Sequence, residues 1–275
     1  MNTHTDNANQ FVMRCTLCRH IASLALVSVI ATAAGDPRAK SLAAPSPRFK
    51  AIAFDAFVLF NPDSVQPEVE RVFPGKGREF TNLWRTRQFE YSWLRSLTNR
   101  YVDFFAITEN ALVFASKTMH LPLPTQEKDR LLDSYFHLAP WPDSAAALRT
   151  LKESGLRIVI LSNFSPLMLR TNAENTGLTP LFNALISTDA NHTYKPDPRA
   201  YRLGTDRLKL PKEQILFVAF GGWDAAGARA FGYPTFWVNR FNQPSEELGI
   251  LADGTSTNLD GLIDFVASRQ PVAGH

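Results

Sequence analysis

Residues 50–60 form a nearly continuous run of apolar side chains that contains a single carboxylate, Asp55. A run of this length, followed by Asn61-Pro62, predicts a β-strand that is buried on both faces. An ionised aspartate in such a strand is costly unless a partner or a reaction uses it. We therefore interpret Asp55 as a functional residue; the alternative is a structural aspartate held by backbone donors at the end of the strand.

The pattern changes to helical spacing between residues 64 and 138, where we identify no strand. Two apolar helix faces are predicted, formed by Trp93, Leu94, Leu97 and Tyr101 and by Leu131, Leu132, Tyr135 and Phe136. Breaks fall at Pro74-Gly75-Lys76-Gly77 and Leu121-Pro122-Leu123-Pro124. We predict a helical cap subdomain over residues 61–141, inserted directly after the first strand.

Strands alternate with helices in the rest of the chain. The predicted strands are 157–161, 184–187, 215–220 and 235–239, and the predicted helices are one capped by Asp143, 166–175, 198–208, 225–230 and 259–268 capped by Asn258. This alternation predicts an α/β fold, a doubly wound parallel sheet of the Rossmann-like kind. Its core domain would consist of residues 49–60 and 142–275.

Ligands of such sheets bind beyond the carboxyl ends of the strands. Asp55 ends the first strand, Ser162 and Asn163 end the second, Lys195 follows the third, and Asp224 follows the fourth. A carboxylate, a hydroxyl, an amide, an ammonium and a second carboxylate are thus expected to meet at one edge. The predicted cap leaves the first strand at that edge and should cover it.

The N-terminal region has the layout of a secretory signal peptide. Arg14 and Arg19 precede the apolar stretch 21–34, and Ala31-Thr32-Ala33 is a small-residue cleavage site. We interpret residues 1–34 as the signal peptide and 35–48 as a linker; a buried amphipathic helix is the alternative. The stretch is too short to span a membrane. We expect a mature, exported protein in the periplasm, without membrane attachment.

Composition narrows the chemistry further. The net charge of +3 over 275 residues, with no Lys/Arg-rich run, argues against a nucleic-acid partner. Both cysteines, Cys15 and Cys18, lie in the leader, where their spacing leaves a redox or metal pair as the alternative to an incidental one. A mature chain without cysteine would have no disulfide, cysteine nucleophile or thiolate metal site.

These residues, in this order, resemble the four motifs of the haloacid dehalogenase superfamily. From residue 49 to about 250 the chain resembles one branch, the type II 2-haloacid dehalogenases. The matching segments are Phe73-Pro74-Gly75-Lys76-Gly77, Trp84-Arg85, Glu90-Tyr91-Ser92-Trp93-Leu94-Arg95-Ser96-Leu97, Leu161-Ser162-Asn163, Tyr194-Lys195-Pro196, Trp223-Asp224-Ala225, Phe231-Gly232-Tyr233-Pro234-Thr235 and Trp237-Val238-Asn239-Arg240.

The resemblance implies hydrolysis of a short 2-haloalkanoic acid to a 2-hydroxy acid. Asp55 would displace the halide and form an aspartyl ester, which water then hydrolyses. Lys195 would keep Asp55 ionised, Arg85 from the cap would meet the halide, and Asp224 would orient Lys195 or position the water. Ser162 and Asn163 would bind the substrate carboxylate, and the apolar wall would consist of Tyr201, Trp223, Phe57 and Phe104.

The same resemblance implies no metal and no cofactor. Phosphatases of the superfamily carry a second aspartate two residues after the nucleophile, where this chain has Phe57, and bind Mg²⁺ through paired acids. The chain also departs from the dehalogenase pattern. It lacks the family's threonine after the nucleophile, and Ala219 and Gly221 replace a serine and an asparagine that support ester hydrolysis. Each lost partner of a buried carboxylate costs about 1–3 kcal/mol.

Simpler interpretations stay open for several of these residues. Lys195 could be a solvated loop lysine, Arg85 a surface charge, and Trp223 and Phe104 plain core residues, while Ser162-Asn163 could cap the next helix. For the whole protein, the alternatives to a dehalogenase are a related hydrolase of a different electrophile and a weakly active small-acid-binding protein. By analogy with the branch, a homodimer is a candidate assembly, with residues 80–101 as its surface.

Overall fold

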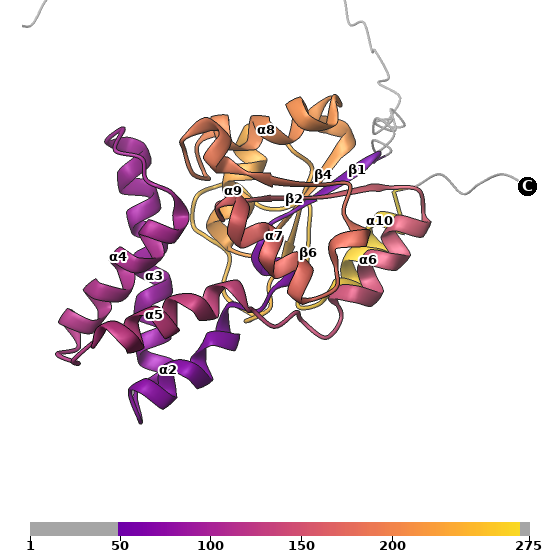
Figure 1. The fold of residues 1–275 in the computed structure, drawn as a ribbon. Coiled ribbons are helices and arrows are strands. Elements are labelled where there is room, and N and C mark those ends of the chain that lie inside the picture. Colours follow the sequence, from indigo (N-terminus) through magenta and orange to yellow (C-terminus); the bar gives the residue numbers. More distant parts are fainter. Residues whose placement is uncertain (1–48, 270–275) are drawn as a thin grey trace, which may run out of the picture. The chain divides into compact units, whose positions relative to one another are not determined.

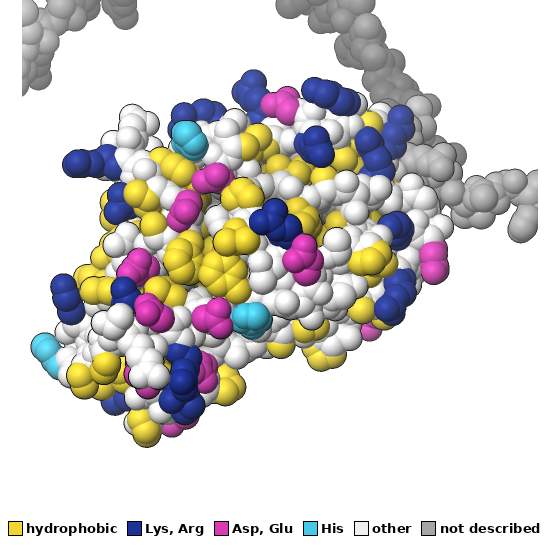
Figure 2. All heavy atoms as spheres, in the orientation of Figure 1, with side chains coloured by type: hydrophobic (Ala, Val, Ile, Leu, Met, Phe, Trp, Pro, Cys, Tyr) yellow, Lys and Arg dark blue, Asp and Glu magenta, His cyan; other side chains and the backbone are white. Residues whose placement is uncertain are grey.

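The computed structural model describes residues 49–269. The predicted signal peptide, the linker and the two cysteines lie outside these residues. Within them, no helix is both long and apolar enough to cross a membrane. On the face drawn in Figure 2, Lys and Arg side chains are scattered, with Asp and Glu among them.

The core of the described chain is a six-stranded, all-parallel sheet in the order β3-β2-β1-β4-β5-β6 (Figure 1). The strands are β1 Ala51–Phe54, β2 Arg157–Ser162, β3 Ala184–Ser187, β4 Ile215–Ala219, β5 Thr235–Val238 and β6 Gly254–Ser256. The chain builds outward from β1 to β3, then crosses to β4 on the other side of β1. This confirms the predicted doubly wound sheet, and it places the switch point beside the end of β1.

Helices cover both faces of the sheet. They are α6 Ser144–Glu153, α7 Pro166–Asn175, α8 Pro198–Leu208, α9 Gly222–Phe231 and α10 Leu259–Ala267, with 3₁₀ turns η3 Thr179–Leu181, η4 Thr188–Asn191 and η5 Lys212–Gln214. Ile52 and Phe54 of β1 point into the core under α6, α7 and α10, whereas Ala51 and Ala53 face α8 and α9. A central strand buried on both faces explains the continuous apolar run.

The region between β1 and α6 is helical and stands to one side of the sheet in Figure 1. It contains η1 Pro62–Val65, α2 Gln66–Val72, α3 Gly77–Leu97, α4 Phe104–Thr118, α5 Thr125–Asp133 and η2 Ser134–Phe136. The long helices α3 and α4 pack together, and the Trp84 indole donates a hydrogen bond to the Thr108 carbonyl at 2.8 Å. We call residues 61–141 the cap.

The predicted buried face of the first long cap helix is wrong. Leu94 and Leu97 of α3 are 53% and 81% exposed. The helix instead buries a mixed stripe, consisting of Phe80, Thr81, Trp84, Gln88 and Ser92. Polar residues can lie in this stripe because they bond inside the cap: the Gln88 amide donates to the Thr108 hydroxyl at 3.0 Å. Apolar spacing alone therefore selected the wrong side of the helix.

Several local features also differ from the prediction. The first strand ends at Phe54, and Ala56–Leu59 forms a helical turn, α1; a fully buried segment has no polar positions that would distinguish the two structures. Helix α9 begins at Gly222, ahead of the predicted residue 225, and β6 was not predicted.

Asp143 occupies the predicted N-cap position of α6, but its side chain makes no capping hydrogen bond there. Its carboxylate instead accepts hydrogen bonds from the Arg240 guanidinium, at 2.6 and 2.8 Å, and from the Leu259 N–H at 2.9 Å. These partners are distant in the sequence, so a local pattern could not reveal them. The predicted cap of α10 is confirmed, because the Asn258 side chain accepts from the Gly261 N–H.

Candidate active site

Asp55 lies directly after β1, at the N-cap of the short helix α1. Its Oδ2 accepts a hydrogen bond from the Phe57 N–H at 3.0 Å, and its own N–H donates to the Val218 carbonyl at 2.9 Å. This is ordinary N-cap geometry, in which an aspartate side chain satisfies a free N–H of the first turn. The aspartate is thereby fixed at the switch point of the sheet, with Oδ1 left for another partner.

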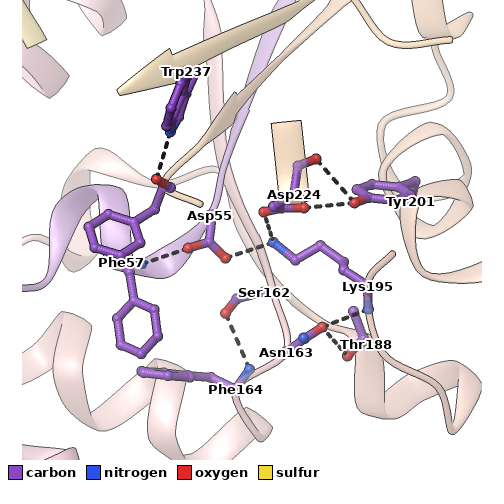
Figure 3. Close-up of polar contacts among 11 residues, drawn as sticks. Asp55, Phe57, Ser162, Asn163, Phe164, Thr188, Lys195, Tyr201, Asp224 and Trp237 are labelled. Atoms are coloured by element: carbon purple, nitrogen blue, oxygen red, sulfur yellow. Dashed lines mark hydrogen bonds and ion pairs between the residues drawn. The ribbon is translucent and has the colours of Figure 1, made fainter. Parts of the chain in front are cut away.

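That partner is Lys195, which joins the two predicted carboxylates. Its Nζ lies 2.6 Å from Asp55 Oδ1 and 2.6 Å from Asp224 Oδ2, and the lysine is fully buried (Figure 3). The Tyr201 hydroxyl donates to Asp224 Oδ1 at 2.7 Å. Lys195 is therefore not a solvated loop lysine, since it holds a buried chain of charge-assisted hydrogen bonds.

The pKa values of this network follow from burial and from the paired charges. Burial disfavours the charged form of Lys195, but Asp224 and Asp55 outweigh it and raise the pKa of the ammonium above its ordinary value. Burial raises the pKa of Asp224 to about 6, Lys195 acts to lower it, and the nearby Asp55 raises it further. The ammonium thus keeps its charge and stays paired with Asp55.

Ser162 and Asn163 lie at the end of β2, beside this network. Ser162 Oγ accepts from the Phe164 N–H at 3.2 Å, and Asn163 Oδ1 accepts from the Lys195 N–H at 2.9 Å. They do not cap the next helix, because Ser165 caps α7 through the Met168 N–H. Within residues 49–269, neither the Ser162 hydroxyl hydrogen nor the Asn163 amide group donates a hydrogen bond. Both donors are available to an anion.

A small cavity of about 10 Å³ adjoins Asp55, and we call it the chamber. Its polar lining consists of Asp55, Ser162, Asn163 and Asp224, and its rings are those of Phe57, Phe89, Phe104, Phe164, Phe220 and Trp223. The volume is about that of a single water molecule. The predicted Phe57, Phe104 and Trp223 line the chamber, so they are more than remote core residues.

Two rings of the chamber, those of Phe164 and Phe89, were missed in the sequence. Phe164 follows Ser162-Asn163 directly, and its ring centroid lies 5.1 Å from that of Phe57. Phe89 lies one helical turn after Arg85 on α3, so its spacing could have indicated it. The remaining ring, that of Phe220, belongs to the first residue after β4.

Tyr201 does not belong to the apolar wall, and that prediction is wrong. It projects from α8 into the core between α8, α9 and the sheet, where it is fully buried. Only its hydroxyl reaches the site, through the hydrogen bond to Asp224. Burial, and after it the charge of Asp224, raises the pKa of this phenol well above its ordinary value, so it remains a donor. We assign Tyr201 a positioning role.

Arg85 lines a second, larger cavity of about 630 Å³, which we call the vestibule. Its lining consists of Asp63, Gln66, Arg78, Asn82, Arg85, Phe89, Phe220, Gly221, Gly222, Trp223, Trp237, Asn239, Arg240, Phe241, Gln243, Pro244, Ser245 and Glu246. The Arg85 guanidinium pairs with Asp63 and donates to Asn82 Oδ1 at 3.0 Å. Its side chain is only 15% exposed, so it is no ordinary surface charge. It does not line the chamber.

The donor set offers no resident-metal site among the described residues, since no group of three or more His, Cys, Asp or Glu side chains is placed to hold an ion. The cation at the centre of the two carboxylates is the Lys195 ammonium itself. The arrangement presents one carboxylate to a small, aromatic-walled space and two free donors across from it. It can therefore bind a small anion and attack it in the absence of bulk water.

Comparison with known proteins gives the family. A family model described as haloacid dehalogenase-like hydrolase matches residues 49–232. The chain is 44% identical to an (S)-2-haloacid dehalogenase of Pseudomonas sp. (strain YL) over 217 residues, covering 78% of this chain and 94% of the relative. It is 39% identical to haloacetate dehalogenase H-2 of Moraxella sp. (strain B), covering 80% and 99%.

Solved structures agree. The L-2-haloacid dehalogenase from Xanthobacter autotrophicus with chloropropionic acid covalently bound superimposes with a TM-score of 0.76 at 34% identity. The match covers 80% of this chain and 98% of that structure. The parallel sheet flanked by helices accords with the fold of these solved structures. The chain therefore belongs to the haloacid dehalogenase-like hydrolases, within their L-2-haloacid dehalogenase branch.

Proposed function

We propose that the protein hydrolyses the carbon–halogen bond of short 2-haloalkanoic acids and releases 2-hydroxy acids. The observation that carries the proposal is the chamber, where the Asp55 carboxylate is held by Lys195 and the Phe57 N–H beside two free donors. The relatives are named for the same substrates, (S)-2-haloacids and haloacetate. A covalently bound chloropropionic acid in one of them supports an intermediate on the enzyme.

In the first half-reaction, an Asp55 oxygen attacks the carbon that bears the halogen. The new carbon–oxygen bond forms as the carbon–halogen bond breaks, and the halide leaves with the bonding electrons. The Ser162 hydroxyl and the Asn163 amide hold the substrate carboxylate through donors that make no hydrogen bond inside the described chain. The six aromatic rings exclude water, which leaves the Asp55 carboxylate more reactive.

The departing halide moves toward the vestibule, where Arg85 provides a permanent positive charge. The vestibule and the chamber share Phe89, Phe220, Gly221 and Trp223 as lining residues, so the path between them is short. Asp63 already neutralises Arg85 in the present structure. We propose that the halide competes with Asp63 for this guanidinium.

In the second half-reaction, water attacks the ester carbonyl of Asp55. The water oxygen joins the aspartyl carbon, the ester bond breaks at that carbon, and one water proton passes to the leaving alkoxide while the other is released. Asp55 returns to a carboxylate, and the 2-hydroxy acid leaves with inverted configuration at its second carbon. Asp224 orients Lys195 in this step, because its two oxygens already accept from Lys195 and Tyr201. Ala219 and Gly221 cannot offer the side-chain hydrogen bonds of the serine and asparagine of the branch, which favours slow ester hydrolysis.

Incubation with 2-chloropropionate tests the proposal. We expect halide release, together with a mass increase on the peptide that contains Asp55 equal to the esterified propionate. Asp55→Asn is the control and should show neither. Sustained halide release supports full turnover, and one equivalent of halide with a trapped ester shows an impaired second step. Absence of both halide and ester with any short 2-haloacid would overturn the function in favour of another electrophile or simple acid binding.

A phosphatase assay with Mg²⁺ is the complementary measurement. We expect no hydrolysis of a phosphate monoester, because Phe57 occupies the position of the acid that would protonate a leaving alkoxide. Mg²⁺-dependent phosphate release that is lost in Asp55→Asn would contradict this expectation.

We further propose that the protein is exported to the periplasm after cleavage of residues 1–34, and that it forms a homodimer through α3. The exposed Leu94 and Leu97 support α3 as an apolar surface. N-terminal sequencing of protein from a periplasmic fraction tests the first proposal. For the second, sedimentation of the wild type is compared with that of Leu97→Glu. A monomeric wild type would contradict the dimer.

A further inference from the structure

The chamber is too small for any substrate of the proposed reaction. Its volume of about 10 Å³ accommodates a single water molecule, whereas even the smallest haloacid has five heavy atoms. The vestibule beyond it has about 630 Å³, which is typical of a binding pocket for a complete small molecule. One of the chamber walls must therefore move, and the position of that wall decides how long a substrate can be.

Most of the chamber wall is supported from behind by the core. Phe57, Phe104 and Phe164 are at most 4% exposed, and the rings of Phe57 and Phe164 pack edge to face with centroids 5.1 Å apart. Displacing such rings would open cavities in a close-packed interior, which is strongly unfavourable. The partition between the two cavities is therefore the wall that can yield.

Phe220 occupies the middle of this partition. Its ring centroid lies 5.7 Å from that of Phe57 on the chamber side and 5.7 Å from that of Phe241 on the vestibule side. Phe241 is itself 40% exposed, so a ring that swings toward it displaces solvent and not core. The backbone of Phe220 remains in place, because its carbonyl accepts from the Trp237 indole at 2.9 Å.

Gly221 and Trp223, which line both cavities beside Phe220, do not form the movable part of the partition. Gly221 contributes no side chain, and a Cβ at that position would lie 2.7 Å from the Trp223 indole nitrogen. Trp223 thus fills the space beside Gly221 and packs against Phe89 and Trp93, with ring centroids 5.2 and 5.4 Å apart. Within residues 49–269, the ring contacts of Phe220 are with Phe57 and Phe241, neither of which belongs to the cap.

We propose that Phe220 determines the chain length of the substrate, an inference that rests on the proposed dehalogenation. A haloacetate carries no alkyl group on the reacting carbon and fits once the ring turns slightly. A longer 2-haloacid must place its alkyl group through the position of Phe220 into the vestibule, the direction in which there is space. The protein therefore favours haloacetates, and removal of the Phe220 ring admits longer chains.

The test compares kcat/KM for 2-bromohexanoate and bromoacetate in the wild type and in Phe220→Ala. We expect the ratio of the two values to rise at least about tenfold in the variant, since a few methylene groups in an apolar pocket discriminate by factors of this order or more. Phe220→Leu, which keeps a larger side chain, should give an intermediate ratio and serves if Phe220→Ala folds poorly.

Phe114→Ala is the matched control. Phe114 lies in the cap, where its ring centroid is 4.0 Å from the Arg87 guanidinium, and it lines neither the chamber nor the vestibule. It should leave the ratio as in the wild type. An unchanged ratio in folded Phe220→Ala and Phe220→Leu, or an equal rise in Phe114→Ala, would overturn the role of Phe220.

Binding of unreactive acids separates this inference from the proposed function. If the wild type forms no ester with any haloacid, the proposed function fails. The role of Phe220 is then tested by the affinities for acetate and hexanoate, measured through quenching of tryptophan fluorescence. Hexanoate should bind at least about tenfold better to Phe220→Ala than to the wild type, with little change for acetate. Equal gains for both acids, or none, would overturn the inference by itself.

Discussion

The carboxyl edge of the sheet and the cap contribute different kinds of side chain to the space around Asp55. The sheet edge supplies every charged or hydrogen-bonding group of the chamber, including Asp55, Ser162, Asn163 and Asp224. From the cap, the chamber receives only the rings of Phe89 and Phe104. The charged cap residues Asp63 and Arg85 stand outside, in the vestibule.

The sheet edge therefore carries the groups that bind and react, whereas the cap helps to control access to them. Asp55 directly follows β1, which is paired on both sides, and Lys195 lies between η4 and α8, where its N–H donates to Asn163 at the end of β2. These anchors hold the two side chains at hydrogen-bond distance. Charges placed there are buried and fully partnered. The cap helices lie across the chamber and add apolar surface, and their ion pair remains partly exposed to solvent. Substitutions at the sheet edge should therefore lower both activity and stability, whereas substitutions in the cap should lower activity with little change in stability.

The largest effect is expected from Lys195→Met. It leaves Asp55 and Asp224 buried without their shared cation, which should lower the free energy of unfolding by about 3–5 kcal/mol. Halide release should fall by roughly 10³-fold or more. Urea denaturation and a halide assay measure the two quantities, with Lys117→Met on the exposed end of α4 as the control. An active variant, within about tenfold of the wild type, would show that the sheet edge does not depend on this lysine.

A smaller loss is expected from Arg85→Met on the cap side. Arg85 lies in the vestibule and not in the chamber, and its ion pair with Asp63 is partly exposed. We therefore expect kcat/KM to fall by about 10- to 100-fold, with the free energy of unfolding changed by no more than about 1 kcal/mol. Arg78→Met is the comparison, since Arg78 lines the same vestibule without an ion pair in the described chain. Equal losses in both variants would indicate a general effect of positive charge in place of a specific halide site.

Tyr201→Phe should weaken the sheet edge without touching the substrate. The change removes one hydrogen bond to the buried Asp224 and should lower the free energy of unfolding by about 1–3 kcal/mol. We expect kcat to fall while KM changes little, as befits a positioning residue. Tyr91→Phe, on a cap tyrosine with no hydrogen bond through its hydroxyl in the described structure, is the control. A change in KM alone would indicate that Tyr201 contacts the substrate as part of the apolar wall.

The smallest effect concerns the pH dependence of stability. Burial raises the pKa of Asp224 from 3.8 to about 6, so between these values the folded protein retains a proton that the unfolded chain has lost. The contribution of Asp224 to the free energy of unfolding is thus present at low pH and lost as the pH rises through about 6.

Asp224→Asn isolates this contribution, because other carboxyls act in the opposite direction; Arg240 and the Leu259 N–H, for example, hold the pKa of Asp143 below its usual value despite burial. The stability of the wild type minus that of Asp224→Asn should fall between about pH 4 and pH 6. A difference that rises with pH would mean that the Lys195 ion pair outweighs burial.

Much of the fold and several site positions could be predicted because they depend on local patterns and on one rule of topology. Alternating strands and helices predict a parallel sheet, and the polar residues at the strand ends, such as Asp55 and Lys195, must then converge. The structure confirms the sheet and brings those residues together. Predictions failed where burial on both faces erased the pattern, as at 56–59, or where buried polar groups displaced apolar ones, as on α3.

The order of the polar residues at the strand ends, and with it the meeting of Asp55, Lys195 and Asp224 at one edge of the sheet, could be predicted from local patterns alone. Only the tertiary structure decided their partners: Tyr201 supports Asp224, Arg85 pairs with Asp63 in the vestibule, and Phe220 closes the chamber. The physical reason is range. The periodicity of a strand or helix depends on residues that are close in sequence, whereas a hydrogen bond or ring contact between segments depends on how whole elements pack.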